Sequence, residues 1–140
     1  MFDNSVELEQ DTRDQVIDAL NQLLGDTFDL MSQTKQAHWN VKGPRFIGLH
    51  ELFDTLAEGL EKWIDEIAER AVAIGGYAKG TVRMAAASSR IPEYPTDVIM
   101  DLDHVHALVE RYAVLANNTF TRERAAVGST FSRRKRRARR

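Results

Sequence analysis

The sequence predicts an all-α protein built as a bundle of long antiparallel helices. Apolar residues recur at three- and four-residue spacing in three long segments, near 11–39, 45–74 and 96–115. No segment shows the strict alternation of apolar and polar residues that indicates a strand. The middle segment is about 30 residues long, against a usual helix of roughly 11–12. A helix of that length buries its apolar stripe only against other long helices, which favours a bundle.

The first helix is expected to begin at Asp11 or Thr12, since either side chain can cap it. It continues to His38 and Trp39, where Gly43-Pro44 and the residues before it break the pattern. Because this turn is short, the next helix is expected to return antiparallel to the first.

The second helix is expected between Pro44 and Gly75-Gly76, where the glycine pair forms a C-cap. At about 100° per residue, its apolar side chains fall within an arc of roughly 120°. They are Leu49, Leu52, Phe53, Leu56, Leu60, Trp63, Ile64, Ile67, Ala71 and Ile74.

A connection follows over residues 77–95, with a short helix expected near 84–89. Thr96 can cap a third long helix, whose apolar pattern stops near Ala125. We therefore expect a helical domain over residues 1–125 and a basic, disordered tail over residues 126–140. Three long helices are present where a four-helix bundle needs four, so the fourth helix is expected to be missing.

Composition excludes several classes of protein. The 140 residues contain no cysteine, which rules out disulfides and thiolate metal sites. The apolar runs are too short to span a membrane. The first residues do not form a secretory signal, so the expected location is the cytoplasm.

The net charge of −2 hides a strong asymmetry along the chain. Residues 122–140 hold nine of the 19 basic residues and one acidic residue, Glu123. The preceding 121 residues therefore hold ten basic and twenty acidic residues. Such a pattern is typical of an acidic domain that carries a basic arm.

Two polar pairs of the second helix are candidates for metal binding. His50 and Asp54 are four residues apart and share a face, as do Asp65 and Glu69. Asp54 and Asp65 are separated by about three turns, so the pairs lie along one strip, roughly 16 Å apart. One ion needs its ligands within about 2–2.6 Å, so the pairs of one chain cannot share it.

The residue numbers suggest how two chains could share a metal ion. The numbers of His50 and Glu69 add to 119, and so do those of Asp54 and Asp65. If two copies of the helix pack antiparallel about a two-fold axis near Gly59 and Leu60, His50 meets Glu69 of the partner and Asp54 meets Asp65 of the partner. Sites between subunits are therefore the hypothesis. The alternative is that these are ordinary solvated surface pairs.

His38 ends the first helix and is expected to lie near His50 across the short turn. Imidazole and carboxylate ligands without thiolate suit ferrous iron, manganese or zinc. The other two histidines, His104 and His106, are expected to be exposed, and Trp39 and Trp63 to lie in the core or an interface.

The spacing His-x11-His-x3-Asp-x10-Asp-x3-Glu, from His38 to Glu69, resembles the signature of the Dps family of mini-ferritins. The resemblance extends from about Leu8 to Asn118. It implies a ferritin-like subunit in a hollow homododecamer, and a ferroxidase centre at the two-fold interface. The metal-binding and catalytic residues are then His38, His50 and Asp54 of one subunit with Asp65 and Glu69 of another.

The resemblance also implies a function. Similar proteins bind ferrous iron, oxidise it preferably with hydrogen peroxide, store the ferric mineral and thereby protect DNA. Beyond about Thr119 the family continues into a fourth helix, whereas this chain continues into an arginine-rich segment.

That basic segment supports a second hypothesis. It can contact DNA phosphates without sequence specificity, which would place the protein at the nucleoid. The candidate residues are Arg133, Arg134, Lys135, Arg136, Arg137, Arg139 and Arg140. Three readings stay open at this point: an iron-oxidising enzyme, a non-enzymatic DNA-binding protein that acts through the tail, and a truncated, inactive bundle.

Overall fold

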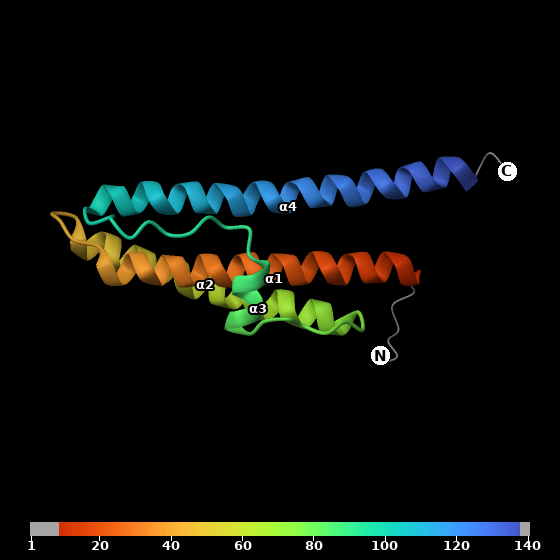
Figure 1. Cartoon of the computed structure of the whole chain (residues 1–140), viewed down its shortest axis with the longest axis horizontal. Coiled ribbons are helices and arrows are strands. Elements are labelled where there is room, and N and C mark those ends of the chain that lie inside the picture. Colours follow the sequence, from red (N-terminus) through yellow and green to blue (C-terminus); the bar gives the residue numbers. More distant parts are fainter. Residues whose placement is uncertain (1–8, 138–140) are drawn as a thin grey trace.

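Three long helices and one short helix make up the fold (Figure 1). The computed structural model describes the backbone of residues 9–137 and the side chains of residues 9–119. The helices are α1 (Gln10–Asn40), α2 (Phe46–Ala73), α3 (Val82–Ser88) and α4 (Asp101–Arg137). Within these limits there is no strand, only an isolated bridge between Lys42 and Met100. The all-α prediction, with three long helices and a short connecting one, is confirmed.

Helix α1 is the centre of the bundle, because it contacts each of the other three helices. Helices α2 and α4 both run antiparallel to α1, and the short α3 crosses in front of it (Figure 1). Helix α1 begins at Gln10, one residue before the expected Asp11, and Glu9 precedes it without a side-chain cap.

The turn between α1 and α2 is closed by a glycine and an aspartate. Gly43 has a φ of +124°, which favours glycine. An added Cβ there would lie 3.1 Å from the Asp101 carboxylate oxygen Oδ2. The same oxygen accepts a hydrogen bond from the backbone N–H of Arg45 at 3.0 Å. The turn is therefore fixed against the first residue of α4.

Helix α2 ends as the glycine pair predicts. Gly75 has a φ of +88°, and the N–H groups of Gly75 and Gly76 bond the carbonyls of Val72 and Ala71, both at 2.9 Å. This is the usual left-handed C-terminal motif, in which the last carbonyls of the helix are satisfied.

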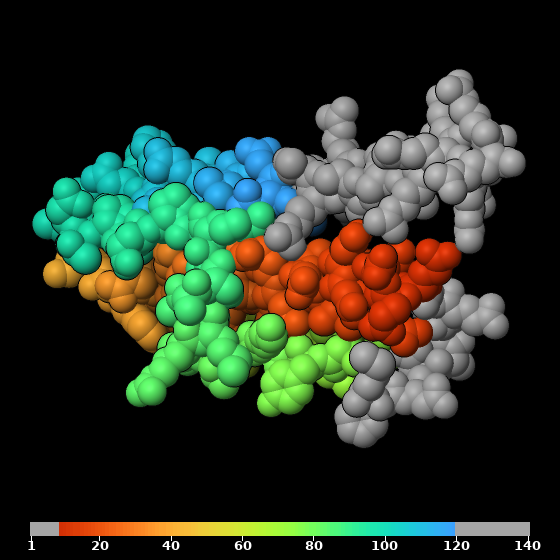
Figure 2. Space-filling model, turned by 45° about the vertical axis from the view of Figure 1, so that its right-hand side comes forward, coloured from red at the N-terminus to blue at the C-terminus, as the bar shows by residue number. Residues whose placement is uncertain are grey.

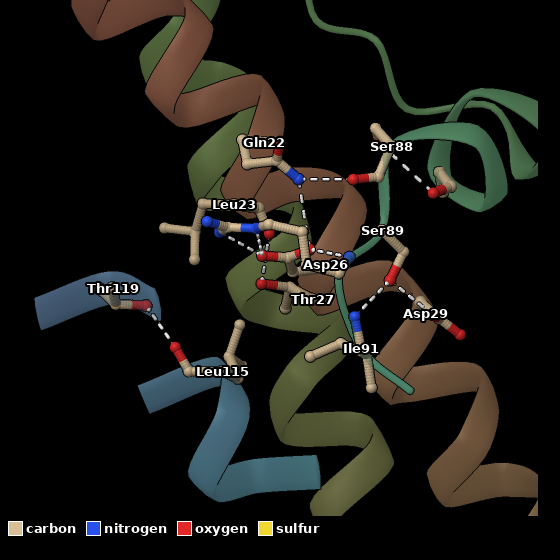
Figure 3. Close-up of polar contacts among 12 residues, drawn as sticks. Gln22, Leu23, Asp26, Thr27, Asp29, Ser88, Ser89, Ile91, Leu115 and Thr119 are labelled. Carbon is tan, nitrogen blue, oxygen red and sulfur yellow. Dashed lines mark hydrogen bonds and ion pairs between the residues drawn. The ribbon is translucent and has the colours of Figure 1, made fainter. Parts of the chain in front are cut away.

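A polar cluster holds the connection after α3 against α1 (Figure 3). Asp26 is fully buried and accepts hydrogen bonds from the backbone N–H of Arg90 at 2.8 Å and from Arg90 Nε at 3.1 Å. Gln22 donates to the Ser88 carbonyl at 2.6 Å, and Ser89 donates to the Asp29 carboxylate at 2.5 Å. These contacts satisfy the backbone of a segment that has little regular structure of its own.

Helix α4 begins at Asp101, five residues after the expected cap Thr96. The N–H groups of Asp103 and His104 bond the Met100 carbonyl, and Leu102 N–H bonds the Asp101 side chain at 2.8 Å. The expected start was wrong because tertiary contacts of Asp101 with the α1–α2 turn fix the first turn of the helix. Thr96 carried only a local signal.

The core sits where the three long helices meet the connection. It comprises Ala37, Val41, Phe53, Tyr94, Ala107 and Leu108, with Leu49, Val105 and Tyr112 packed against it. Figure 2 shows the connection, in green, lying along the outside of α1 between α3 and α4.

The backbone of α4 continues as a helix to Arg137. We expected regular structure to stop near Ala125, so this expectation is corrected for residues 126–137. The segment contains no proline, four of its residues are arginine and one is lysine, and its one interior glycine costs a helix only about 1 kcal/mol. The division into a domain and a tail stays a prediction. In the part of the chain described, no helix is long and apolar enough to cross a membrane.

Candidate metal centre

His38, near the end of α1, and His50, in the second turn of α2, lie face to face. Their ring centroids are 3.7 Å apart and the ring planes differ by 21°. The expected approach of the two histidines across the short turn is thereby confirmed.

Each of the two histidines is held by the backbone of the other. His38 Nδ1 lies 2.8 Å from the His50 carbonyl oxygen, and His50 Nδ1 lies 2.9 Å from the His38 carbonyl oxygen. A carbonyl oxygen can only accept, so both Nδ1 atoms carry the proton. In a neutral imidazole the lone pair is then on Nε2, which is the form that binds a metal ion. The fold thus presets the tautomer of both rings.

Asp54 lies one turn after His50 on α2. Its Oδ1 atom is 4.0 Å from His38 Nε2. Metal–nitrogen and metal–oxygen bonds are about 2.0–2.2 Å long, so one ion can reach both atoms. The His38 side chain is 12% exposed and that of Asp54 is 43% exposed, so solvent reaches the carboxylate more readily than the ring.

Asp54 already forms an ion pair with a lysine of α1. Lys35 Nζ donates a hydrogen bond to Asp54 Oδ1 at 2.6 Å. This bond is the largest cause of a lowered Asp54 pKa, with burial acting in the opposite direction and the charges of Lys35, His38 and His50 adding to the lowering. Asp54 is therefore ionised at neutral pH, as a metal ligand must be.

Asp65 and Glu69 lie further along α2 and are exposed. Their distance from Asp54 along the helix axis is set by the rise of about 1.5 Å per residue, so the subunit does not bring them to the histidines. Among the residues whose side chains are described, no three His, Asp or Glu groups converge on one point. The ligand role of all five residues stays a prediction that needs a second subunit.

The residues at the expected two-fold axis differ in their surroundings. Leu60 is 8% exposed and belongs to the core of its own subunit. Around Gly59, an added Cβ would meet no atom within 4 Å. Of the two, only Gly59 faces space that another chain could occupy.

The donor set fits iron by its chemistry. Two imidazole nitrogens and one ionised carboxylate, with no sulfur, suit a first-row divalent ion and leave positions open for further ligands.

The expectation that His104 is exposed was wrong. His104 is 1% exposed, not solvated, because Tyr94 covers it and its Nδ1 lies 2.7 Å from the Tyr94 hydroxyl. Burial lowers the His104 pKa and raises the Tyr94 pKa to about 12. Trp39 and Trp63 are 66% and 61% exposed, so neither lies in the core of the subunit, and their place in an interface stays a prediction.

Lys35 is a residue of this site that the sequence does not reveal. A lone lysine on a helix gives no signal, although its position three residues before His38 places both on one face. The basic residues proposed to bind DNA lie outside the part of the chain whose side chains are described. This holds for the side chains from Arg133 to Arg137, and Arg139 and Arg140 lie outside the described backbone as well.

Comparison with known proteins identifies the family. A family model for the ferritin-like domain matches residues 17–126. A relative from Agrobacterium fabrum, named DNA protection during starvation protein, is 44% identical over 111 residues, which is 79% of this chain and 68% of that protein. The chain belongs to the Dps family of ferritin-like proteins.

Solved Dps structures agree with the fold. Dps from Mycobacterium smegmatis superposes with a TM-score of 0.82 at 30% identity, covering 87% of this chain and 74% of that one. Dps from Vibrio cholerae O1, described as a ferritin-like diiron-carboxylate protein, gives 0.82 at 26% identity, covering 95% and 82%. A Deinococcus radiodurans relative is 34% identical over 106 residues, yet this chain spans only 44% of it.

Proposed function

We propose that this Dps-family chain binds ferrous iron between two subunits and oxidises it. The observation that carries the proposal is the pair of reciprocal hydrogen bonds between His38 and His50. These bonds hold two imidazoles beside the ionised Asp54. The ligand set is completed by Asp65 and Glu69 of a second copy. Similarity to a diiron-carboxylate protein and to proteins named for DNA protection supports the same chemistry.

Hydrogen peroxide is the proposed oxidant. Two ferrous ions give one electron each to one peroxide, whose O–O bond breaks. With two waters, the products are two units of ferric oxyhydroxide and four protons. The protein positions the ions and neutralises their charge with carboxylates, while the redox chemistry is that of iron. Removal of ferrous iron together with peroxide would protect DNA, in the cytoplasm, from hydroxyl radicals.

The test is an anaerobic ferrous titration followed by peroxide, read as ferric absorbance against a protein-free control. Asp65→Ala should lower ferrous binding and oxidation at least about tenfold, in line with the loss of a metal ligand. Glu66→Ala, at the neighbouring exposed position but about 100° around the helix, is the matched control and should leave both unchanged. Absorbance no higher than in the protein-free control would refute the ferroxidase proposal.

The assembly is proposed to be a homo-oligomer with two-fold interfaces, and a dodecamer by similarity to the family. Size-exclusion chromatography with light scattering tests it. A protein that stays monomeric at all concentrations cannot form the proposed centre.

DNA binding through the basic segment is a second candidate function. The run Arg133–Arg140 carries seven basic residues in eight positions, which favours phosphate contacts without base specificity. A gel shift at low and high salt, with and without residues 131–140, tests this candidate. Equal retention of DNA by the shortened chain would refute it.

A further inference from the structure

Lys35 and a bound metal ion would compete for the same oxygen atom. The Lys35 ammonium lies 2.6 Å from Asp54 Oδ1, and that oxygen is also the carboxylate atom 4.0 Å from His38 Nε2. An ion bound to Asp54 Oδ1 and His38 Nε2 would stand within a few Å of the ammonium. Two positive charges at that separation repel strongly in a partly desolvated site.

The surroundings of Lys35 make the contact specific. The side chain is 29% exposed, so it is packed along the helix surface and not free in solvent. Its ammonium also lies 5.9 Å from the centroid of the Trp39 ring, within the range of a cation–π contact. Lys35 therefore contacts Asp54 and Trp39 at the same time, and the Trp39 ring, on the same helix, stays available to the ammonium when it leaves Asp54.

We propose that Lys35 is a displaceable counter-cation, which holds Asp54 in the empty site and must leave when a divalent ion binds. This inference rests on the proposed metal centre. While no metal is bound, the Lys35 ammonium would neutralise part of the negative charge of the site. It would thereby reduce the repulsion between the two acidic helix faces that meet when two subunits assemble. Lys35 would also make the site select divalent over monovalent cations. A singly charged ion gains too little electrostatic energy at Asp54 to displace the lysine.

The affinity for Zn²⁺ tests the proposal without any redox step. Isothermal titration of the full chain with Zn²⁺ should show about tenfold tighter binding for Lys35→Met than for the wild type, equivalent to about one pKa unit of interaction. Lys35→Arg keeps the positive charge and should stay within about twofold of the wild type. Lys79→Met removes the same charge from an exposed position in the α2–α3 connection and should change nothing. Equal or weaker binding by Lys35→Met overturns the proposal.

Amine labelling gives a second measurement on the unchanged protein. Acetic anhydride should modify Lys35 more rapidly when Zn²⁺ is bound, because the ammonium is then released from its ion pair, while labelling of Lys79 stays constant. Labelling of Lys35 that does not change with Zn²⁺ contradicts displacement.

An Asp54→Asn variant separates this proposal from the proposed function. If Asp54→Asn leaves Zn²⁺ affinity unchanged, the metal centre itself is wrong and the role of Lys35 falls with it. If Asp54→Asn weakens binding but Lys35→Met does not tighten it, only the role of Lys35 is refuted.

Discussion

Replacement of Asp26 by alanine should destabilise the bundle by about 3 kcal/mol. The Asp26 carboxylate is fully buried and is the acceptor that ties Arg90, with its backbone N–H and its guanidinium, to α1. Loss of one partner of a buried ion pair costs about 3–5 kcal/mol. The lower end applies because the Arg90 side chain is 34% exposed and can be rehydrated. Asp26→Asn keeps an acceptor for the backbone N–H and should cost about half as much.

Thermal unfolding followed by circular dichroism at fixed protein concentration measures the effect. For a chain of this length, about 3 kcal/mol corresponds to a Tm roughly 10 °C lower. Asp14→Ala is the control, since Asp14 is exposed and bonds only the Gln10 side chain at 2.8 Å among the contacts described; its effect should stay within about 0.5 kcal/mol. A cost below about 1 kcal/mol for Asp26→Ala would show that desolvation of the carboxylate cancels its contacts, and would refute the reasoning.

Three further predictions concern the core, the turn and a buried histidine. Phe53→Ala, at a core side chain that is 2% exposed, should lower the free energy of unfolding by about 3–5 kcal/mol in denaturant titrations, and a loss under 1 kcal/mol would contradict the assigned core. Gly43→Ala should cost about 1–3 kcal/mol in the same assay because φ is +124°, whereas Gly48→Ala, where an added Cβ meets nothing, should be neutral or stabilising. His104 should titrate below 6.5 in NMR because burial lowers its pKa; the folded state binds this proton less readily than the unfolded state, so the contribution of His104 to stability declines as the pH falls below 6.5. A midpoint at or above 6.5 would contradict its burial.

Much of the fold could be predicted because its signals are local. The apolar stripe of α2 and its glycine C-cap are patterns of residues close together in the sequence. They predicted both ends of that helix to within a few residues. The approach of His38 to His50 could be predicted because the turn between α1 and α2 is short, so the two helices must be antiparallel neighbours. In these places local preference and tertiary structure agree.

The wrong predictions concern features that are fixed by tertiary contacts and not by the local sequence. Thr96 is a good local cap, but Asp101 begins α4 because it also binds the turn at Arg45. His104 looked like one of two solvated histidines, and only the return of the connection over it, with Tyr94, buries it. Lys35 could not be found from spacing, since its partner Asp54 is on another helix.

Mixed assembly of two defective subunits tests the shared metal centre most directly. One chain carries His50→Ala with Asp54→Ala, the other carries Asp65→Ala with Glu69→Ala, and different affinity tags allow the mixed assembly to be isolated after coexpression in equal amounts. Each variant alone has no complete site, whereas a mixed two-fold pair has one intact site of two. When equal amounts of the two chains assemble at random into a dodecamer, about half of the two-fold pairs are mixed. We therefore expect about a quarter of the wild-type ferrous binding in the mixed assembly and none in either parent. A mixed assembly that binds no more ferrous iron than its parents, or a parent that retains wild-type binding, would contradict a centre formed between subunits.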